Sequence, residues 1–302
     1  MIWASLIHLG FNMWGDREAP EAWFEYVCAK PYLRFDYNLW TELLEKMAAV
    51  GMNMVVIDLG EGIKYESHPE LGVKGSWTVD FLRSELAKVR GMGIEPIPKL
   101  NFSTTHDIWL GPYSRCVSTD TYYAVCRDLI AEVCTIFDKP RFFHLGMDEE
   151  RTEYQGHLNY AAARQHDLWW HDFLFLVEQV EKAGSRAWVW SDYVWHHPEA
   201  FYARMPKSVL QGNWYYPPEF SRDIDPVRAY NDLESHGYDQ FPTGSNWICQ
   251  ENFGNMVEYC KKNIAPERLL GFLQTTWYPT LNACRDRQIQ AVELVGNAIA
   301  EF

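Results

Sequence analysis

The sequence of 302 residues lacks the features of membrane proteins and of small disulfide-stabilised secreted proteins. Its longest apolar runs, such as Met54-Val55-Val56-Ile57, are far shorter than the roughly 20 residues that a membrane helix needs. The N-terminal residues Met1-Ile2-Trp3-Ala4 contain no basic stretch followed by an apolar block, which a signal peptide would have. The seven cysteines form no Cys-x-x-Cys pair, which argues against a zinc knuckle and a disulfide framework. These absences predict a cytoplasmic protein, although a secreted chain trimmed of its leader would look the same.

Positive charge is also scarce. Lys and Arg total 27 against 41 Asp and Glu, which gives a net charge of −14. A surface of that sign repels phosphate backbones and anionic lipid headgroups, so we expect neither nucleic acid nor a membrane as a partner. Few basic residues follow the predicted strands, which argues against a phosphate site and phosphoryl transfer.

No linker rich in Pro, Gly or Ser divides the chain. Apolar segments of strand length alternate with amphipathic helical segments, which indicates repeated βα units around a parallel sheet. Eight strands are predicted, at 5–12, 53–59, 94–101, 141–147, 186–191, 209–214, 240–246 and 269–275. Eight helices are predicted, near 37–50, 78–90, 119–137, 165–183, 198–204, 226–236, 252–263 and 286–300. We therefore predict an α/β fold with a single (β/α)8 TIM barrel domain over residues 1–302. A doubly wound open sheet is the alternative, but no Gly-x-Gly-x-x-Gly follows a strand.

What the sequence has in abundance is aromatic residues: 14 Trp, 17 Tyr and 16 Phe, together 16% of the chain. An indole ring offers a large flat face and one hydrogen-bond donor, which suits the apolar face of a sugar as well as it suits a core. In a TIM barrel the active site is built from strand ends and the loops that follow them. The residues at these positions are mostly carboxylates, amides and aromatics: Asn12, Asp16, Asp58, Glu61, Asn101, His106, Asp148, Glu149, Glu150, Asp192, Trp214, Tyr215, Tyr216, Asn246, Trp247, Trp277 and Tyr278.

The fourth predicted strand ends in three consecutive acids. Like charges this close raise the pKa of at least one carboxyl group, as a general acid requires, and a glycosidic oxygen leaves poorly unless it is protonated. We expect Asp148 and Glu149 to carry out this acid chemistry. We expect Glu150 and Glu153 instead to cap the next helix or to face solvent. Successive residues of a strand point to opposite faces, so Asp148 and Glu149 can share a pocket only where the strand has ended.

The run His144-Leu145-Gly146-Met147-Asp148-Glu149 resembles the His-x-Gly-x-Asp-Glu motif of glycoside hydrolase family 20, the β-N-acetylhexosaminidases. Segments along nearly the whole chain are similar to the hexosaminidase D-like branch of that family. They are residues 53–58 with Tyr65-Glu66, residues 98–101 leading to His106, the Trp-x-Asp of residues 188–192, Trp214-Tyr215-Tyr216, Asn246-Trp247 and Thr276-Trp277.

The resemblance implies removal of terminal β-linked N-acetylhexosamine, either gluco or galacto, by a retaining and substrate-assisted mechanism without a cofactor or metal. Glu149 would be the general acid/base, Asp148 would hold the N–H of the 2-acetamido group, and Tyr216 would hydrogen-bond its oxygen, which attacks the anomeric carbon. The remaining predicted substrate-binding residues are His106, Trp190, Asp192, Trp214, Asn246, Trp247 and Trp277. The chain departs from the family at Thr105, where glycine is usual, at Pro279, where glutamate is usual, and in having no arginine on its first strand.

Two other readings remain open. A metal-dependent isomerase or hydrolase would use Asp58, His106, His144 and Asp192 as ligands, but no His-x-His or Glu-x-x-His pair supports it. His144, midway in an apolar strand, is more typical of a hydrogen-bonded core histidine. The other reading is a sugar-binding barrel that has lost catalysis, which would keep the tryptophans and lose the acid.

Overall fold

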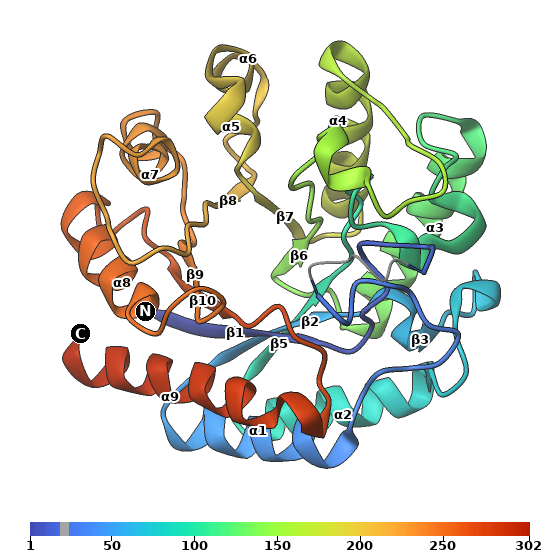
Figure 1. Cartoon of the computed structure of the whole chain (residues 1–302), viewed down its shortest axis with the longest axis horizontal. Coiled ribbons are helices and arrows are strands. Elements are labelled where there is room, and N and C mark those ends of the chain that lie inside the picture. The colour runs from blue at the N-terminus through green and yellow to red at the C-terminus, as the bar shows by residue number, and fades with distance from the viewer. Residues whose placement is uncertain (19–23) are drawn as a thin grey trace.

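The computed structural model of the protein describes residues 1–18 and 24–302. Eight parallel strands form one sheet in the order β8-β7-β6-β5-β2-β1-β10-β9 (Figure 1). They are β1 (Ile2–His8), β2 (Met54–Asp58), β5 (Glu95–Lys99), β6 (Phe142–His144), β7 (Arg186–Trp190), β8 (Leu210–Gly212), β9 (Thr243–Ser245) and β10 (Gly271–Thr275). Parallel bridges from Gln211 to Gln240 and from Trp214 to Thr243 join the two ends of this order. The predicted (β/α)8 TIM barrel is confirmed, and the open-sheet alternative is wrong.

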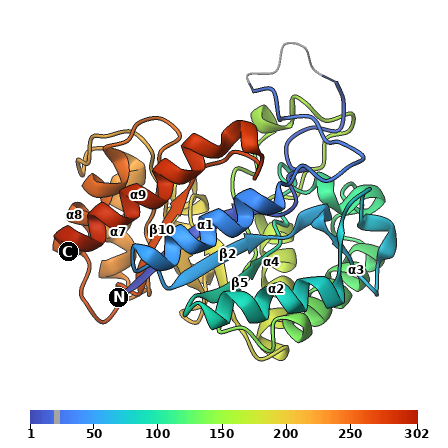
Figure 2. The same cartoon turned by 90° about the horizontal axis from the view of Figure 1, so that it is seen from below.

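Helices surround the sheet on its outer side (Figures 1 and 2). They are α1 (Tyr37–Ala49), α2 (Val79–Gly91), α3 (Asp120–Ile136), α4 (His166–Lys182), α5 (Tyr193–His196), α6 (Pro198–Arg204), α7 (Asp225–Ser235), α8 (Asn252–Asn263) and α9 (Arg285–Glu301). In α1 the Asp36 side chain accepts hydrogen bonds from the first-turn amides of Asn38 and Leu39, and the buried residues recur at helical spacing. All eight predicted helices are present, whereas the short α5 was not predicted.

The first strand differs from its prediction. It begins three residues earlier than expected and ends at His8, which lies opposite Asp58 of β2. Beyond His8 the chain leaves the sheet, because the amides of Leu9 and Gly10 both bond to the carbonyl of Asp58. The next two amides, of Phe11 and Asn12, bond to the buried Glu61 carboxylate instead of a strand. A side chain distant in sequence therefore ends β1.

Smaller elements fill the connections and were not predicted. A two-stranded parallel ribbon is formed by β3 (Ile63–Lys64) and β4 (Trp77–Thr78). Within residues 1–18 and 24–302 the short 3-10 helices are η1 (Gly60–Gly62), η2 (Pro69–Leu71), η3 (Ile108–Tyr113), η4 (Thr152–Gln155) and η5 (Asn282–Cys284). They are too short to leave a periodic pattern in the sequence.

The core lies in two layers, one between sheet and helices and one inside the barrel. The inner layer includes Leu6 of β1, Val56 of β2 and the fully buried Trp188 of β7, so some of the many tryptophans are packing residues. Alternate residues such as Ile7 and Ile57 point to the outer layer. Among the described residues, no helix has the length and apolar character to cross a membrane.

Candidate active site

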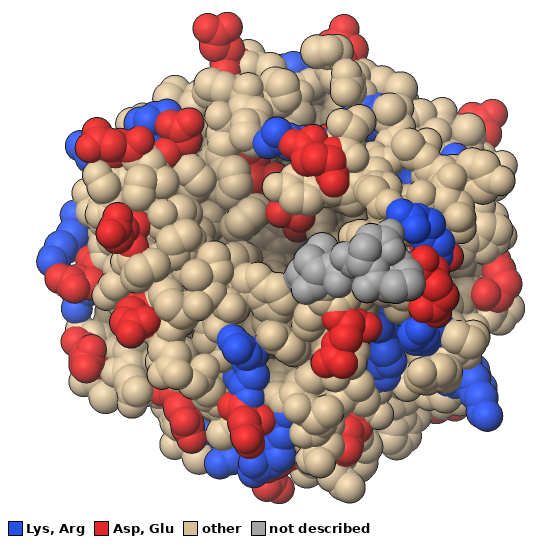
Figure 3. Space-filling view, in the orientation of Figure 1, with Lys and Arg blue, Asp and Glu red and all other residues tan. Residues whose placement is uncertain are grey.

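A cavity of about 470 Å³ opens at the C-terminal ends of the strands. Figure 3 shows the molecule hollowed near the middle of the face seen in Figure 1. The cavity is lined by Trp14, His106, Asp148, Glu149, Glu153, Tyr154, His157, Trp190, Trp214, Tyr216, Trp247, Ile248 and Trp277. Eight of the ten predicted site residues are therefore brought together here, and the exceptions are Asp192 and Asn246.

The carboxylates lie on an irregular turn after β6. Strand β6 ends at His144, and the backbone then has positive φ at Gly146 (71°), Met147 (77°) and Glu149 (56°). Each non-glycine residue in this region costs about 1–3 kcal/mol and persists only when its surroundings enforce it. At Gly146 a Cβ would lie 1.9 Å from the Asn101 Oδ1 atom, so only glycine fits. The turn breaks the alternation of a strand and lets two consecutive acids face one cavity.

Side chains from neighbouring strands hold this turn. Asn101, the second residue after β5, accepts a hydrogen bond from the Met147 amide (3.2 Å) and donates from Nδ2 to Asp148 Oδ1 (2.8 Å). Asp192, the second residue after β7, accepts from the Glu149 amide at 2.9 Å. The hydroxyl of Ser103 donates to the Asp148 carbonyl. Side chains that follow β5 and β7 thus determine where Asp148 and Glu149 point.

His106 stands beside both carboxylates. Its Nε2 atom lies 3.5 Å from Glu149 Oε2, and its Nδ1 atom lies 3.7 Å from Asp148 Oδ1 and 2.9 Å from the Thr105 hydroxyl. Burial lowers the pKa of His106 below its ordinary value, which favours the neutral imidazole. A neutral ring does not stabilise the carboxylate form of Glu149 as an imidazolium would.

The environment of Glu149 favours its protonated form. Burial raises the pKa of Glu149 to about 8, and the nearby charges of Asp148 and Asp192 act in the same direction. Burial, followed by the charge of Asp148, also raises the pKa of Asp192. At neutral pH the Glu149 carboxyl group therefore holds a proton that it can donate into the cavity.

Aromatic rings form the rest of the wall. Trp190 and Trp277 lie 6.0 Å apart between ring centroids, and Trp214 stacks on Tyr216 at 5.1 Å. The Trp277 Nε1 atom donates to the Tyr216 hydroxyl oxygen at 2.9 Å, and this hydroxyl, which also contacts Thr275, has one proton of its own to donate. Broad apolar faces with a few directed polar groups are typical of a sugar site.

Two predicted lining residues lie outside the cavity wall. Asp192 sits behind the turn, where it accepts from the Glu149 amide and, at 3.4 Å, from Trp214 Nε1. Asn246 is 2% exposed and donates from Nδ2 to the Arg287 carbonyl and to Gln290 Oε1, both at 3.0 Å and both on α9. Contact of either residue with substrate stays a prediction.

The four ligands of the alternative metal site are not brought together. Asp58 bonds to Lys99 (2.5 Å) and lies 3.3 Å from His8 inside the barrel, and these partners hold the pKa of Asp58 at about 2 despite its burial. His144 is a buried histidine whose Nδ1 atom accepts from the Gly146 amide at 3.0 Å. Among the described residues, the compact group with metal-ligand atoms is His106, Asp148 and Glu149, within 4.8 Å of one another.

The prediction that Glu150 caps a helix or faces solvent is wrong. Its side chain is 7% exposed and forms an ion pair with Arg164. Glu153 pairs with Arg151 and reaches the cavity mouth. Sequence reasoning also missed Trp14, Tyr154, His157 and Ile248 as lining residues. Tyr154 and His157 lie farther from the end of β6, in and after η4, and left no signal in the sequence. For Trp14 and Ile248 the available signal was their position in the segments that follow β1 and β9.

Several solved structures are similar to this chain in fold. No family model matches the chain, and no curated protein matches it. The β-N-acetylhexosaminidase from Bacteroides fragilis is 14% identical with a TM-score of 0.65, over 97% of this chain and 65% of that chain. The family 20 exo-β-N-acetylglucosaminidase from Vibrio harveyi, solved with N-acetylglucosamine, is 14% identical with a TM-score of 0.65. The match covers 97% of this chain and 54% of the Vibrio chain. The family 20 β-N-acetylhexosaminidase from Streptomyces coelicolor is 12% identical with a TM-score of 0.62. The match covers 97% of this chain and 63% of the Streptomyces chain.

The chain thus spans between 54% and 65% of the length of these three proteins. At such low identity the likeness concerns the path of the backbone and not the side chains of the site. The chain has the barrel fold of solved family 20 β-N-acetylhexosaminidases.

Proposed function

We propose that this protein is a glycoside hydrolase that removes terminal β-linked N-acetylhexosamine. The observation that carries the proposal is the pair of consecutive carboxyl groups, Asp148 and Glu149, facing one aromatic-lined cavity, with the Glu149 pKa raised to about 8. The shared fold with N-acetylhexosaminidases supports the same substrate class. The free state of all seven cysteines supports placing the protein in a reducing cytoplasm.

Glu149 is the general acid of the proposed reaction. Its proton passes to the glycosidic oxygen as the bond to the anomeric carbon breaks, which turns a poor leaving group into a neutral alcohol. The resulting carboxylate then takes a proton from the water that attacks the anomeric carbon in the second step. Because the His106 ring beside Glu149 is neutral, the Glu149 carboxyl group can alternate between its protonated and its ionised form.

The nucleophile of the first step is the 2-acetamido oxygen of the substrate. Neighbouring carboxyl groups on one turn cannot flank the sugar from opposite faces, as the pair of a two-carboxylate retaining enzyme must, at about 5 Å across the ring. Asp148 accepts a hydrogen bond from the acetamido N–H and so increases the electron density on its oxygen. Tyr216 donates its hydroxyl proton to this oxygen and holds the oxygen below the anomeric carbon. Water opens the cyclised intermediate with overall retention.

A panel of aryl β-glycosides with and without the 2-acetamido group tests this mechanism. We expect the N-acetylated substrates to be cleaved orders of magnitude faster, and a thiazoline mimic of the cyclised intermediate to inhibit competitively. Equal cleavage of plain β-glucosides or β-galactosides would show that the 2-acetamido group is not the nucleophile.

Two measurements beside this panel test the two alternative functions, a sugar-binding barrel and a metal-dependent enzyme. Binding of N-acetylglucosamine without turnover of any aryl glycoside would indicate a sugar-binding barrel. Loss of activity on dialysis against a chelator, restored by a divalent cation, would indicate a metal at the group of His106, Asp148 and Glu149.

A further inference from the structure

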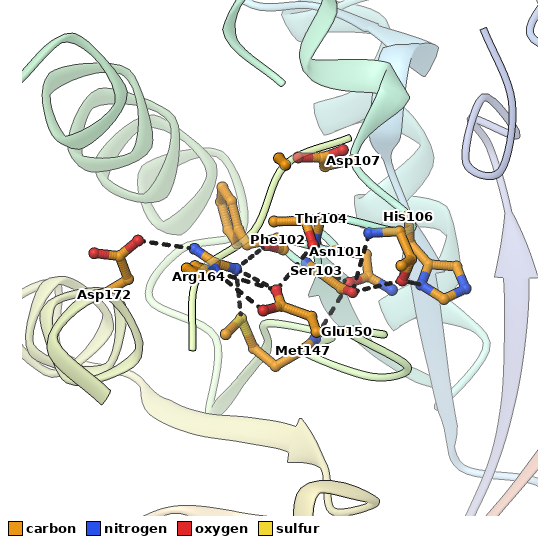
Figure 4. Close-up of polar contacts among 12 residues, drawn as sticks. Asn101, Phe102, Ser103, Thr104, His106, Asp107, Met147, Glu150, Arg164 and Asp172 are labelled. Atoms are coloured by element: carbon orange, nitrogen blue, oxygen red, sulfur yellow. Dashed lines mark hydrogen bonds and ion pairs between the residues drawn. The ribbon is translucent and has the colours of Figure 1, made fainter. Parts of the chain in front are cut away.

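A buried arginine lies beneath the loops that carry the candidate catalytic residues. Arg164, two residues before α4, is 4% exposed, and its side chain is fully enclosed. The guanidinium donates on one side to the Glu150 carboxylate, at 3.1 Å from Nε to Oε2. On the other side Nη1 donates to Asp172 of α4 (3.2 Å) and to the Tyr122 hydroxyl of α3 (3.3 Å). Figure 4 shows Arg164 between Asp172 and Glu150.

The arginine and Glu150 join two loops that come from different strands. Arg164 Nη2 donates to the Phe102 carbonyl at 2.6 Å, in the loop after β5 that leads to His106. Glu150 Oε1 accepts from the Thr104 amide of that same loop at 3.0 Å. Glu150 itself follows Glu149 directly, so one ion pair fixes the backbone on both sides of the contact between His106 and Glu149.

The conformation of the turn requires such support. Met147 and Glu149 both have positive φ, which side chains other than glycine rarely adopt. The hydrogen bonds from Asn101 and Asp192 hold the amides of these two residues. The hydroxyls of Ser103 and Thr105, in the loop that leads to His106, bond to the Asp148 carbonyl and join that loop to the turn on the near side of Glu149. The Glu150 carboxylate adds a connection on the far side of Glu149, because it accepts from the Thr104 amide and is itself held by the ion pair with Arg164.

We propose that Glu150 and Arg164 are positioning residues that set the separation of His106, Asp148 and Glu149. This inference rests on the proposed function. Neither residue touches the substrate cavity, so their effect on chemistry passes through the backbone of the two loops. Misplacement of a reacting group by about 1 Å can slow a reaction roughly 100-fold.

The test compares Glu150→Gln with the matched control Asp172→Asn. Each replacement removes one negative partner of the same arginine and leaves the other in place, so Arg164 keeps a counter-charge in both variants. Only Glu150 bonds to the loop of His106, whereas Asp172 bonds to Ser118 and Tyr123 on the outer side. Tyr122→Phe, which removes a neutral bond to the arginine, is the second control if Asp172→Asn does not fold.

We expect Glu150→Gln to lower kcat about 10- to 100-fold on N-acetylated substrates with poor leaving groups, with KM changed less than about twofold. The controls should keep kcat within about twofold even if their melting temperature falls. In the background of Glu149→Gln, replacing Glu150 should have little further effect, because the group that it positions is gone. Equal losses of kcat in Glu150→Gln and in a folded control, or an unchanged kcat in Glu150→Gln, would overturn the proposal.

A carboxyl-carbon NMR titration of Glu149 makes the test independent of the proposed activity. A loosened turn admits water, so the pKa of Glu149 should move toward its ordinary value in Glu150→Gln and stay in place in the control. The same titration curve in both variants would contradict the positioning role. An inactive wild-type protein would refute the proposed function, and the titration would still decide this inference.

Discussion

At the residue scale, Glu149 combines a raised pKa with a place on the cavity wall. We expect Glu149→Gln to slow hydrolysis of substrates with poor leaving groups by about 10²–10⁴-fold, because the amide cannot supply the proton. Substrates with activated leaving groups should lose much less. Steady-state rates with both substrate classes measure the difference, and circular dichroism checks the fold. Normal turnover of a natural disaccharide by the variant would exclude Glu149 from the role.

The raised pKa of Glu149 also predicts a dependence of stability on pH. In the folded protein the group titrates near 8, against 4.5 for an ordinary glutamate. Between these values the folded state holds a proton that the unfolded state has lost, so this group's contribution to stability falls as pH rises through the window. Glu149→Gln carries no such penalty. We expect its melting temperature to match wild type near pH 5 and to exceed it near pH 8.

Thermal unfolding of both proteins at several pH values checks this expectation, and the kinetics give a second view. The wild-type kcat/KM should fall as pH rises through about 8, where the free enzyme loses the acid form of Glu149. A melting-temperature difference that stays constant with pH would mean that Glu149 is not protonated in the folded protein at neutral pH.

Trp277 forms part of the cavity wall and bonds to Tyr216. We expect Trp277→Ala to weaken sugar binding by on the order of 1 kcal/mol or more, because it removes the ring face that the sugar contacts. The pH profile should not change, since indole does not titrate. Trp277→Phe, which keeps a ring but not the N–H, should lose less. Unaltered affinity for N-acetylglucosamine in calorimetry would show that Trp277 is a packing residue.

At the scale of elements, the turn after β6 depends on Gly146. A Cβ there would lie 1.9 Å from Asn101 Oδ1 and 2.8 Å from Asn101 Cα, at a φ of 71°. We expect Gly146→Ala to cost about 2 kcal/mol or more in the free energy of unfolding. The control is Gly254→Ala on the exposed face of α8, where a Cβ meets nothing within 4 Å. That change should stabilise by about 0.5–1 kcal/mol.

Urea unfolding of the two alanine variants measures both effects. Equal stability of Gly146→Ala and wild type would contradict the close contact with Asn101, and a destabilised Gly254→Ala would contradict the open surface of α8. The comparison separates a glycine required by tertiary contact from one that only lowers helix propensity.

At the scale of the whole molecule, the net charge of −14 acts on any charged substrate. Within the cavity the acidic residues Asp148 and Glu153 add to that field, whereas Glu149 holds a proton at neutral pH. We expect an aryl N-acetylglucosaminide bearing a 6-sulfate to have a lower kcat/KM than its neutral counterpart. The gap should narrow as salt is raised from about 0.01 M to 0.15 M, because the Debye length falls from about 30 Å to 8 Å. A gap independent of salt would indicate steric rejection instead.

The barrel and its helices could be predicted from the sequence because their signals are local. In α1 the capping Asp36 and the apolar residues at helical spacing lie within 14 residues, Asp36 to Ala49. The end of β1 could not be predicted, because it is set by the Glu61 carboxylate some 50 residues further along the chain. The buried state of Glu150 depends in the same way on Arg164 and Thr104, whose partnership leaves no pattern in the sequence.

By itself the sequence determined the number and order of the βα units and the group of strand-end residues that face one cavity. Both follow from short-range patterns and from the rule that parallel strands end at one rim. Only the tertiary structure decided that Asn246 points to α9, that Asp192 lies behind the turn, and that Trp14 and His157 join the wall. The physical reason is that such placements depend on hydrogen bonds and steric contacts between distant loops, and these form only when the barrel closes.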